Sequence, residues 1–329
     1  MLIIPIFVPH AGCPHDCCFC DQKKISGHKE PPSVEEIKKT VDSYLDIIKN
    51  YSVVQIAFFG GSFTAIPREM QEMFLQAVNP YIREGLVDSV RLSTRPDYID
   101  GETLSMLKSY SVKTIELGAQ SMDDDVLIAS GRGHTSADTA RAAELIRAYG
   151  FELGLQTMTG LPGASYESDL YTADRIIDLN PQLVRIYPTV VIRDTFLHKM
   201  YEKGTYNPPS LDKTIDLCAE LMIKYENKKV KVIRMGLQSS DGISVGGDVV
   251  AGPYHPAFGQ LVKSRIAYDK LAKMAEDNMA NGKDDSESRV FTASVPYKEL
   301  SDYIGQKNVN VIRLKEQFGY EKVIIKPIK

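Results

Sequence analysis

The stretch Gly12-Cys13-Pro14-His15-Asp16-Cys17-Cys18-Phe19-Cys20-Asp21 gathers four of the five cysteines of the chain into eight positions. Three of them, Cys13, Cys17 and Cys20, have the spacing C-x3-C-x2-C. A loop this short can direct three thiolates at three corners of a cubic [4Fe–4S] cluster, which leaves the fourth iron without a protein ligand. The spacing therefore predicts an iron–sulfur site held by these three residues.

Two other uses of the cysteines remain open at this point. Zinc could bind the same loop, with Cys18 or His15 completing a tetrahedron, although zinc sites usually draw on two separated ligand pairs. Redox-active or purely structural thiols are the other alternative. A disulfide framework is not expected, because so long a chain has few cysteines and Cys218 lies far from the others.

The composition indicates a globular protein of one large and one small domain. The chain has 329 residues, of which 43% are hydrophobic, and its net charge is −4. Any contact with nucleic acid therefore needs a local basic patch. We expect no membrane span, since no apolar run is long enough, and the apolar start of the chain lacks signal-peptide features. These features predict a cytoplasmic protein.

Six predicted strands alternate with helical patterns up to about residue 225. This alternation of apolar strands and amphipathic helices is typical of a parallel sheet covered by helices. In such sheets, functional residues lie at the carboxyl ends of the strands. The expected strands are 2–8, 53–59, 89–93, 114–118, 153–158 and 183–189, and the expected helices are 34–49, 70–83, 101–109, 136–149 and 166–179.

Polar or glycine-rich motifs follow several of these strands. Gly60-Gly61 would let the backbone approach a ligand closely, although glycine pairs also simply form turns. Arg132, at the entry to the helix at 136–149, could pair with a carboxylate, and its alternative is an ion pair with the acidic run 123–125.

Together these motifs resemble the radical S-adenosylmethionine (SAM) domain of the Elongator catalytic subunit, a tRNA-modifying enzyme. The resemblance covers residues 1–225 and rests on five segments: 60–67, 94–98, 116–121, 132–135 and 186–195, the last being the most distinctive. It implies an α/β fold with a (β/α)6 partial TIM barrel, a [4Fe–4S] cluster and SAM as cofactors. By motif position it also implies SAM contacts from Gly60, Gly61, Ser93, Gln120, Arg132 and Gln156.

The sequence also departs from the Elongator pattern. The Elongator loop has a wider first gap between its cysteines, whereas C-x3-C-x2-C is the general radical SAM form. After residue 225 the sequence is too short for an acetyltransferase domain, so the resemblance does not carry acetyl-CoA use or the Elongator product over to this chain. The earlier motifs are shared with oxygen-independent coproporphyrinogen oxidases.

Residues 226–275 are predicted to form a Gly/Pro-rich extension that covers the barrel. Its densest part, residues 246–259, contains Tyr254 and His255, which are candidates for proton or radical handling in a substrate-facing lid. The alternative is a plain structural connection.

A change of charge marks the end of the chain. Residues 276–288 are predicted to be an acidic linker, and residues 289–329 carry eight basic and four acidic side chains. Within this basic module, Gly305-Gln306-Lys307-Asn308 resembles the Gly-x-x-Gly loop of KH-type motifs, which clamps an RNA backbone. Asn308 replaces the second glycine, and Asn tolerates the left-handed conformation. The alternative is a small α/β cap on the barrel.

The sequence thus predicts a radical SAM enzyme that modifies a base in RNA, with tRNA as the expected substrate class. RNA and an electron donor such as flavodoxin or ferredoxin are the expected partners. Two alternatives are a radical SAM enzyme acting on a small molecule such as a porphyrin precursor, and a non-catalytic, zinc-bearing RNA-binding protein.

Overall fold

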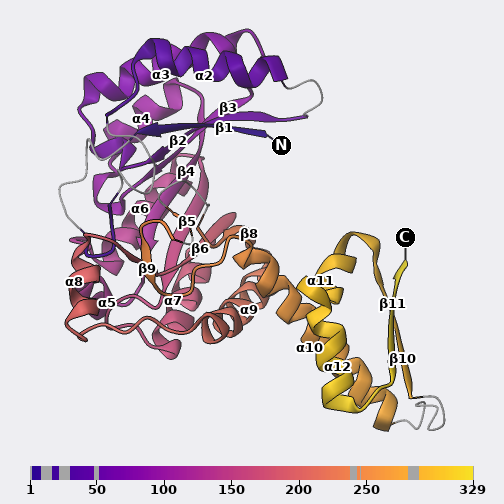
Figure 1. Cartoon of the computed structure of the whole chain (residues 1–329). Helices are drawn as coiled ribbons and strands as arrows, with labels where there is room; N and C mark the ends of the chain where they lie inside the picture. The colour runs from indigo at the N-terminus through magenta and orange to yellow at the C-terminus, as the bar shows by residue number, and fades with distance from the viewer. Residues whose placement is uncertain are drawn as a thin grey trace. The chain divides into compact units, whose positions relative to one another are not determined.

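The chain folds into two compact units, which we describe separately (Figure 1). The first unit comprises Met1–Ser210 and Lys224–Pro256, and the second comprises Leu211–Ile223 and Ala257–Lys329. The computed structural model describes residues 2–8, 17–21, 30–47, 52–237, 243–244, 246–280 and 289–328.

A seven-stranded parallel sheet forms the centre of the first unit, with the strand order β1-β2-β3-β4-β5-β6-β8. It curls into a half-barrel, which confirms the predicted partial TIM barrel. The strand β8 pairs with β6 and extends the six predicted strands to seven. The strands are β1 (Leu2–Val8), β2 (Val54–Gly60), β3 (Ser89–Thr94), β4 (Val112–Gln120), β5 (Glu152–Thr159), β6 (Leu183–Pro188) and β8 (Lys231–Met235).

Helices alternate with these strands, as the sequence predicts. Their starts are encoded locally: Thr135 and Ser165 each accept a hydrogen bond from a backbone N–H in the first turn, in reciprocal capping boxes. Apolar residues such as Ile37 and Val41 on the first helix are fully buried. The helices are α2 (Val34–Ile47), α3 (Arg68–Arg83), α4 (Gly101–Ser109), α5 (Asp124–Ala129), α6 (Ser136–Ala148) and α7 (Tyr166–Asp178).

The Gly/Pro-rich segment pairs with the chain that follows β6. A short antiparallel ladder joins β7 (Val191–Ile192) to β9 (Val249–Ala251). Gly252 follows β9 with φ +104°, and a Cβ there would lie 3.1 Å from the Thr189 carbonyl oxygen. Only glycine fits both the conformation and the contact. The segment is therefore packed on the loop after β6.

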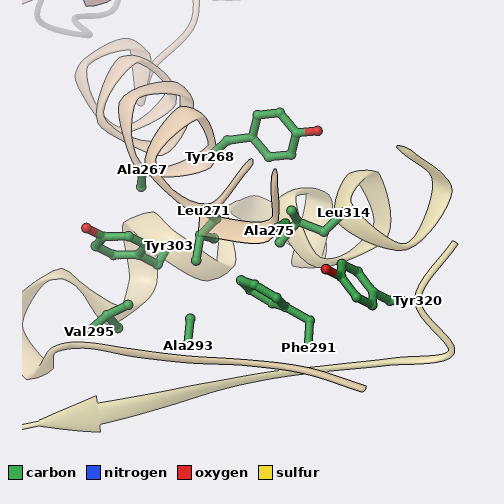
Figure 2. Packing of buried hydrophobic residues seen from close by; sticks show 10 residues of the cluster. All are labelled: Ala267, Tyr268, Leu271, Ala275, Phe291, Ala293, Val295, Tyr303, Leu314 and Tyr320. Atoms are coloured by element: carbon green, nitrogen blue, oxygen red, sulfur yellow. The ribbon is translucent and has the colours of Figure 1, made fainter. Parts of the chain in front are cut away.

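The second unit contains a two-stranded parallel sheet and the helices α10, α11 and α12, together with the first part of α9 (Leu211–Asn227). Its core is formed by side chains such as Leu271, Phe291 and Leu314, which are almost fully buried (Figure 2). Asn310 is also buried, and its Nδ2 donates to Ser264 O at 2.9 Å and to Tyr303 O at 3.2 Å. The elements are α10 (Phe258–Ala280), β10 (Val290–Pro296), α11 (Leu300–Ile304), α12 (Val309–Phe318) and β11 (Lys322–Ile328).

Where the sequence predicts a linker from residue 276, the structure instead continues α10 to Ala280. The helix extends because Leu271 and Ala275 pack in the core of the second unit. The rest of the predicted linker, residues 281–288, lies outside the described residues. The domain boundaries proposed from the sequence stay predictions.

Two further helices, both belonging at least in part to the first unit, complete the chain: α8 (Phe196–Glu202) and α9 (Leu211–Asn227). Among the described residues, no helix combines the length and apolarity needed to cross a membrane.

Candidate active site

The second half of the cysteine loop is held between two helices. The backbone N–H of Cys18 donates to Ser130 O at 3.0 Å, just after α5, and its carbonyl accepts from Leu197 N at 2.7 Å, in α8. A turn in which Cys20 N donates to Cys17 O at 3.0 Å completes the segment. The backbone thus fixes the position of these three cysteines. Cys13 and His15 lie outside the described residues.

The three thiols have different surroundings. Cys18 packs against Val191, Leu197 and Tyr206, and burial raises the pKa of its thiol to about 12. A thiol that stays neutral is a poor metal ligand, so this environment disfavours Cys18 as a fourth zinc ligand.

Cys17 and Cys20 differ from Cys18 in what they contact. Cys17 Sγ accepts a hydrogen bond from Arg132 Nη1 at 3.2 Å. Cys20 is half-buried and lines the main cavity of the first unit.

The Gly60-Gly61 turn lies against the end of β1. Gly60 has φ +109°, and a Cβ there would meet Val8 O at 3.0 Å. The backbone N–H of Gly61 donates to the same carbonyl at 2.8 Å. This turn therefore requires glycine at position 60. It places backbone beside β1, the strand that precedes the cysteine loop.

A cavity of about 1210 Å³ lies inside the half-barrel. Its walls include side chains at or near the carboxyl ends of the strands together with the end of the cysteine loop. Five residues predicted from the sequence line it: Cys20, Gly60, Ser93, Gln120 and Gln156. The structure thus brings together four of the six predicted SAM contacts and one predicted cluster ligand.

Arg132 and Gly61 are not among the residues that line the cavity. Arg132 is buried and donates from Nη2 to Gly118 O at 2.6 Å and from Nη1 to Cys17 Sγ. Its own carbonyl accepts from Arg95 Nη2 at 2.7 Å. The predicted alternative, a surface ion pair with residues 123–125, is wrong because the guanidinium points inward.

His134, two residues further on, is a neutral group. Burial and the cationic side chains of Arg132 and Arg95 lower the pKa of its imidazole to about 4. Its Nε2 lies 3.3 Å from Ala119 O, which ties the segment to the end of β4.

The predicted catalytic pair is not part of the cavity wall. Tyr254 donates from its hydroxyl to Ile243 O at 2.8 Å and packs against Val190 and Ile192. His255 is half-buried and does not line the cavity either. The contacts of Tyr254 are those of a structural loop, and a catalytic role for either residue stays a prediction.

A buried charged layer, not predicted from the sequence, crosses the middle of the half-barrel. Glu116 on β4 accepts from Arg91 Nη1 at 3.0 Å and from Arg185 Nε and Nη2 at 2.5 and 3.0 Å. Gln156 Nε2 donates to Glu116 at 3.1 Å and to Ser93 Oγ at 3.0 Å. The predicted SAM contacts Ser93 and Gln156 are therefore positioned by this layer.

The face of the Arg185 guanidinium is also covered. Its Cζ lies 4.8 Å from the ring centroid of Phe59 on β2, a cation–π geometry. Tyr187, two residues along β6, has its hydroxyl 3.5 Å from Arg185 Nη1 and lines the same cavity. The two-residue period of β6, which places Leu183, Arg185 and Tyr187 on one face, is the sequence signal that identifies them.

The predicted RNA-binding loop lies in the second unit, between α11 and α12. Gly305 has φ +74°, and a Cβ there would strike Val309 Cγ1 at 2.7 Å and Ser264 Oγ at 2.9 Å. Lys307 and Asn308 are exposed and both adopt the left-handed conformation, with φ +53° and +61°. The expectation that Asn308 tolerates this geometry is confirmed.

Two family profiles match the sequence. The radical SAM superfamily matches residues 7–176, and the radical SAM C-terminal domain matches residues 181–268. The first match includes the end of β1, the cysteine loop and β2 to β5, and the second includes the strands β6 and β8.

Curated relatives match the same part of the chain. The tRNA uridine(34) acetyltransferase of Methanocaldococcus infernus is 26% identical, over 65% of this chain and 48% of the relative. Elongator complex protein 3 of Homo sapiens is also 26% identical, over 65% of this chain and 47% of the relative. The chain thus spans about half the length of the curated relatives it matches.

Solved structures are similar in fold. Archaeal Elp3 from Methanocaldococcus infernus, lacking its N-terminus, superposes with a TM-score of 0.64 at 22% identity, over 83% of this chain and 62% of that one. Coproporphyrinogen III oxidase from Escherichia coli gives a TM-score of 0.52 at 17% identity, over 69% and 52%.

Proposed function

Because the chain belongs to the radical SAM superfamily, we propose that it is an enzyme that cleaves SAM reductively and modifies a base in RNA, with tRNA as the substrate class. The observation that carries the first half is the convergence of Cys20, Gly60, Ser93, Gln120 and Gln156 on one cavity. The second half is supported by the names of the relatives and by the loop between α11 and α12.

The residues of the cysteine loop fit the cluster that this family generally uses. Cys13, Cys17 and Cys20 would hold it, and Arg132 would keep the Cys17 thiolate hydrogen-bonded. When bound, the cluster and SAM together supply one-electron cleavage of the C–S bond and a radical that removes hydrogen from a substrate. A one-electron donor such as flavodoxin or ferredoxin would then be the redox partner.

Two buried polar atoms, one in the cavity wall and one beside the cysteine loop, support a SAM site here. Among the described residues, the buried atoms without a hydrogen-bond partner include Gln120 Oε1, in the cavity wall, and Arg132 Nε, on the side chain that contacts Cys17. Buried polar groups without partners are rare, so these atoms fit a ligand that supplies the missing bonds. Gln120 also has φ +65°, an uncommon conformation for a residue that is not glycine. Gly60, Gly61, Ser93 and Gln156 would complete the contacts.

Cluster binding is tested by anaerobic reconstitution. We expect about four irons per chain, visible absorption that dithionite bleaches, and SAM-dependent release of 5′-deoxyadenosine. A variant with Ala at Cys13, Cys17 and Cys20 should lose all three properties. Cys18→Ala is the matched control in the same loop, and it should keep them because Cys18 is a buried neutral thiol. SAM cleavage by the triple variant, or colourless zinc-loaded protein from the wild type, would refute the assignment.

The RNA substrate is tested separately in cells. Nucleosides from the tRNA of a deletion strain and its parent are compared by mass spectrometry. A modified nucleoside should disappear in the deletion strain and return when the wild-type gene, but not the triple cysteine variant, is supplied. Identical nucleoside profiles would remove RNA as the substrate while leaving SAM cleavage intact.

A further inference from the structure

The cavity inside the half-barrel has a strongly basic lining. Among the described residues that line it, the charged ones are the cationic Arg91, Lys113, Arg185, Lys231 and Arg234 and a single carboxylate, Glu152. Glu116 adds one more negative charge behind the two buried arginines. A concave site with an excess of one charge sign attracts ligands of the opposite sign.

Two buried arginines, Arg91 and Arg185, share the single carboxylate of Glu116. Glu116 is 1% exposed and already has Arg91 as an ion-pair partner at 3.0 Å. Arg185, which is 6% exposed, adds a second guanidinium to the same carboxylate. Burying a cation is unfavourable unless its charge is matched, and the lining cations outnumber the two carboxylates Glu116 and Glu152, so the cavity favours a further anion.

Arg185 also offers a donor on its remaining edge. Nε and Nη2 form the fork on Glu116, and Phe59 covers the guanidinium face. The third nitrogen, Nη1, lies 3.5 Å from the Tyr187 hydroxyl, and both residues line the cavity. A guanidinium edge beside a hydroxyl is a suitable pair of donors for a carboxylate or phosphate oxygen.

We propose that this cavity binds an anionic group of the substrate, a carboxylate or a phosphate, on Arg185 and Tyr187, with Arg91 adding charge. This inference rests on the proposed function, because it concerns the same site. It adds that the molecule in the cavity beside SAM carries a negative charge. The exposed Lys113 and Lys231, at the opposite strand ends from the Gly60 turn, attract the anion toward the cavity.

The test uses two anions as probes, [13C]acetate and inorganic phosphate. Their NMR lines are measured with the reconstituted full chain while SAM is present at saturation. We expect saturable broadening of at least one probe by the wild-type protein. Broadening of acetate alone identifies a carboxylate site, and broadening of phosphate alone identifies a phosphoester site.

Two variants with opposite effects locate the site. Arg185→Gln should weaken probe binding about tenfold or more, because a charge-assisted hydrogen bond is lost. Glu116→Gln should strengthen it, because the arginines then lack their negative partner. Misfolding cannot produce both changes. Arg68→Gln, which removes the same charge from a partly exposed ion pair with Glu72 on α3, is the control and should bind like the wild type.

Three outcomes would overturn the inference: neither probe broadens, Arg185→Gln binds both probes like the wild type, or saturating SAM abolishes binding of both. The last result would mean that the site holds the carboxylate of SAM itself. Because the probes are measured without turnover, failure of anion binding is distinct from failure of SAM cleavage, which is assayed by 5′-deoxyadenosine release.

Discussion

Asp169 on α7 is a buried carboxyl group that contacts the turn after β5. This turn in turn contacts Tyr206, which packs against Cys18. Its Oδ2 accepts from Gly160 N at 3.0 Å, and the Gly160 carbonyl accepts from the Tyr206 hydroxyl at 2.7 Å. Burial raises the pKa of Asp169 to about 7. At mildly acidic pH the carboxyl group is therefore neutral, and in this form it holds the turn after β5.

This pKa predicts a pH-dependent effect of Asp169→Asn. The folded protein holds the Asp169 proton more tightly than the unfolded chain, so this group's contribution to stability is complete below pH 3.8 and is lost as the pH rises through 7. The amide of the variant does not ionise in this range. From pH 5 to pH 8 the variant should gain about 2–3 kcal/mol relative to the wild type in urea unfolding. A difference that does not change with pH would contradict the burial argument.

At the scale of elements, strand alternation explains which site residues the sequence predicts. Ser93, Gln120 and Gln156 lie at or near the carboxyl ends of successive parallel strands, and all three reach the cavity. Arg132 lies in a loop, where no period fixes the side-chain direction. Its contact with Cys17 joins positions 115 residues apart and could not be predicted from either motif.

The ion pair of Glu116 with Arg185 could not be predicted from the sequence, for a different reason. The two residues lie on β4 and β6, which are separated by β5, so they are not neighbours in the sheet. Gly154, which pairs with Glu116 on the intervening strand β5, leaves space for the Glu116 side chain: a Cβ there would lie 2.8 Å from Glu116 Cγ. Strand periodicity predicts neighbouring pairs, whereas this contact depends on a missing side chain.

Gly154→Ala tests this element-scale argument. The added methyl group would meet Glu116 Cγ at 2.8 Å, and the ion pairs of Glu116 with Arg91 and Arg185 hold that side chain in place. We expect a loss of about 1–3 kcal/mol in unfolding free energy. Gly118→Ala on β4 is the matched control, because its nearest atom is the end of a side chain, Gln120 Nε2 at 3.0 Å. Equal stability of both variants would show that the charged layer tolerates displacement.

At the scale of the whole molecule, the sequence predicts the order of the elements better than the boundaries of the units. Residues 211–223 precede β8 yet belong to the second unit. Within that unit Asp216 forms an ion pair with Arg265 on α10. Such a return of the chain depends on contacts between helices distant in sequence, which local periodicity does not reveal. The reversal of charge after residue 288, by contrast, is visible in the sequence alone.

That charge reversal allows a test of RNA binding in a protein whose net charge is −4. Lys307 is exposed in the turn that opens α12, whereas Lys273 is an exposed lysine on α10 of the same unit. If the turn contacts a phosphate, Lys307→Glu should weaken binding of bulk tRNA and reduce the slope of log K against log salt by about 1. Lys273→Glu makes the same change of net charge and should leave the slope near its wild-type value. Fluorescence anisotropy between about 50 and 200 mM salt measures both quantities. Equal effects of the two variants would show that RNA responds only to the overall charge of the unit, and the loop would then be a structural turn fixed by Gly305 and Asn310.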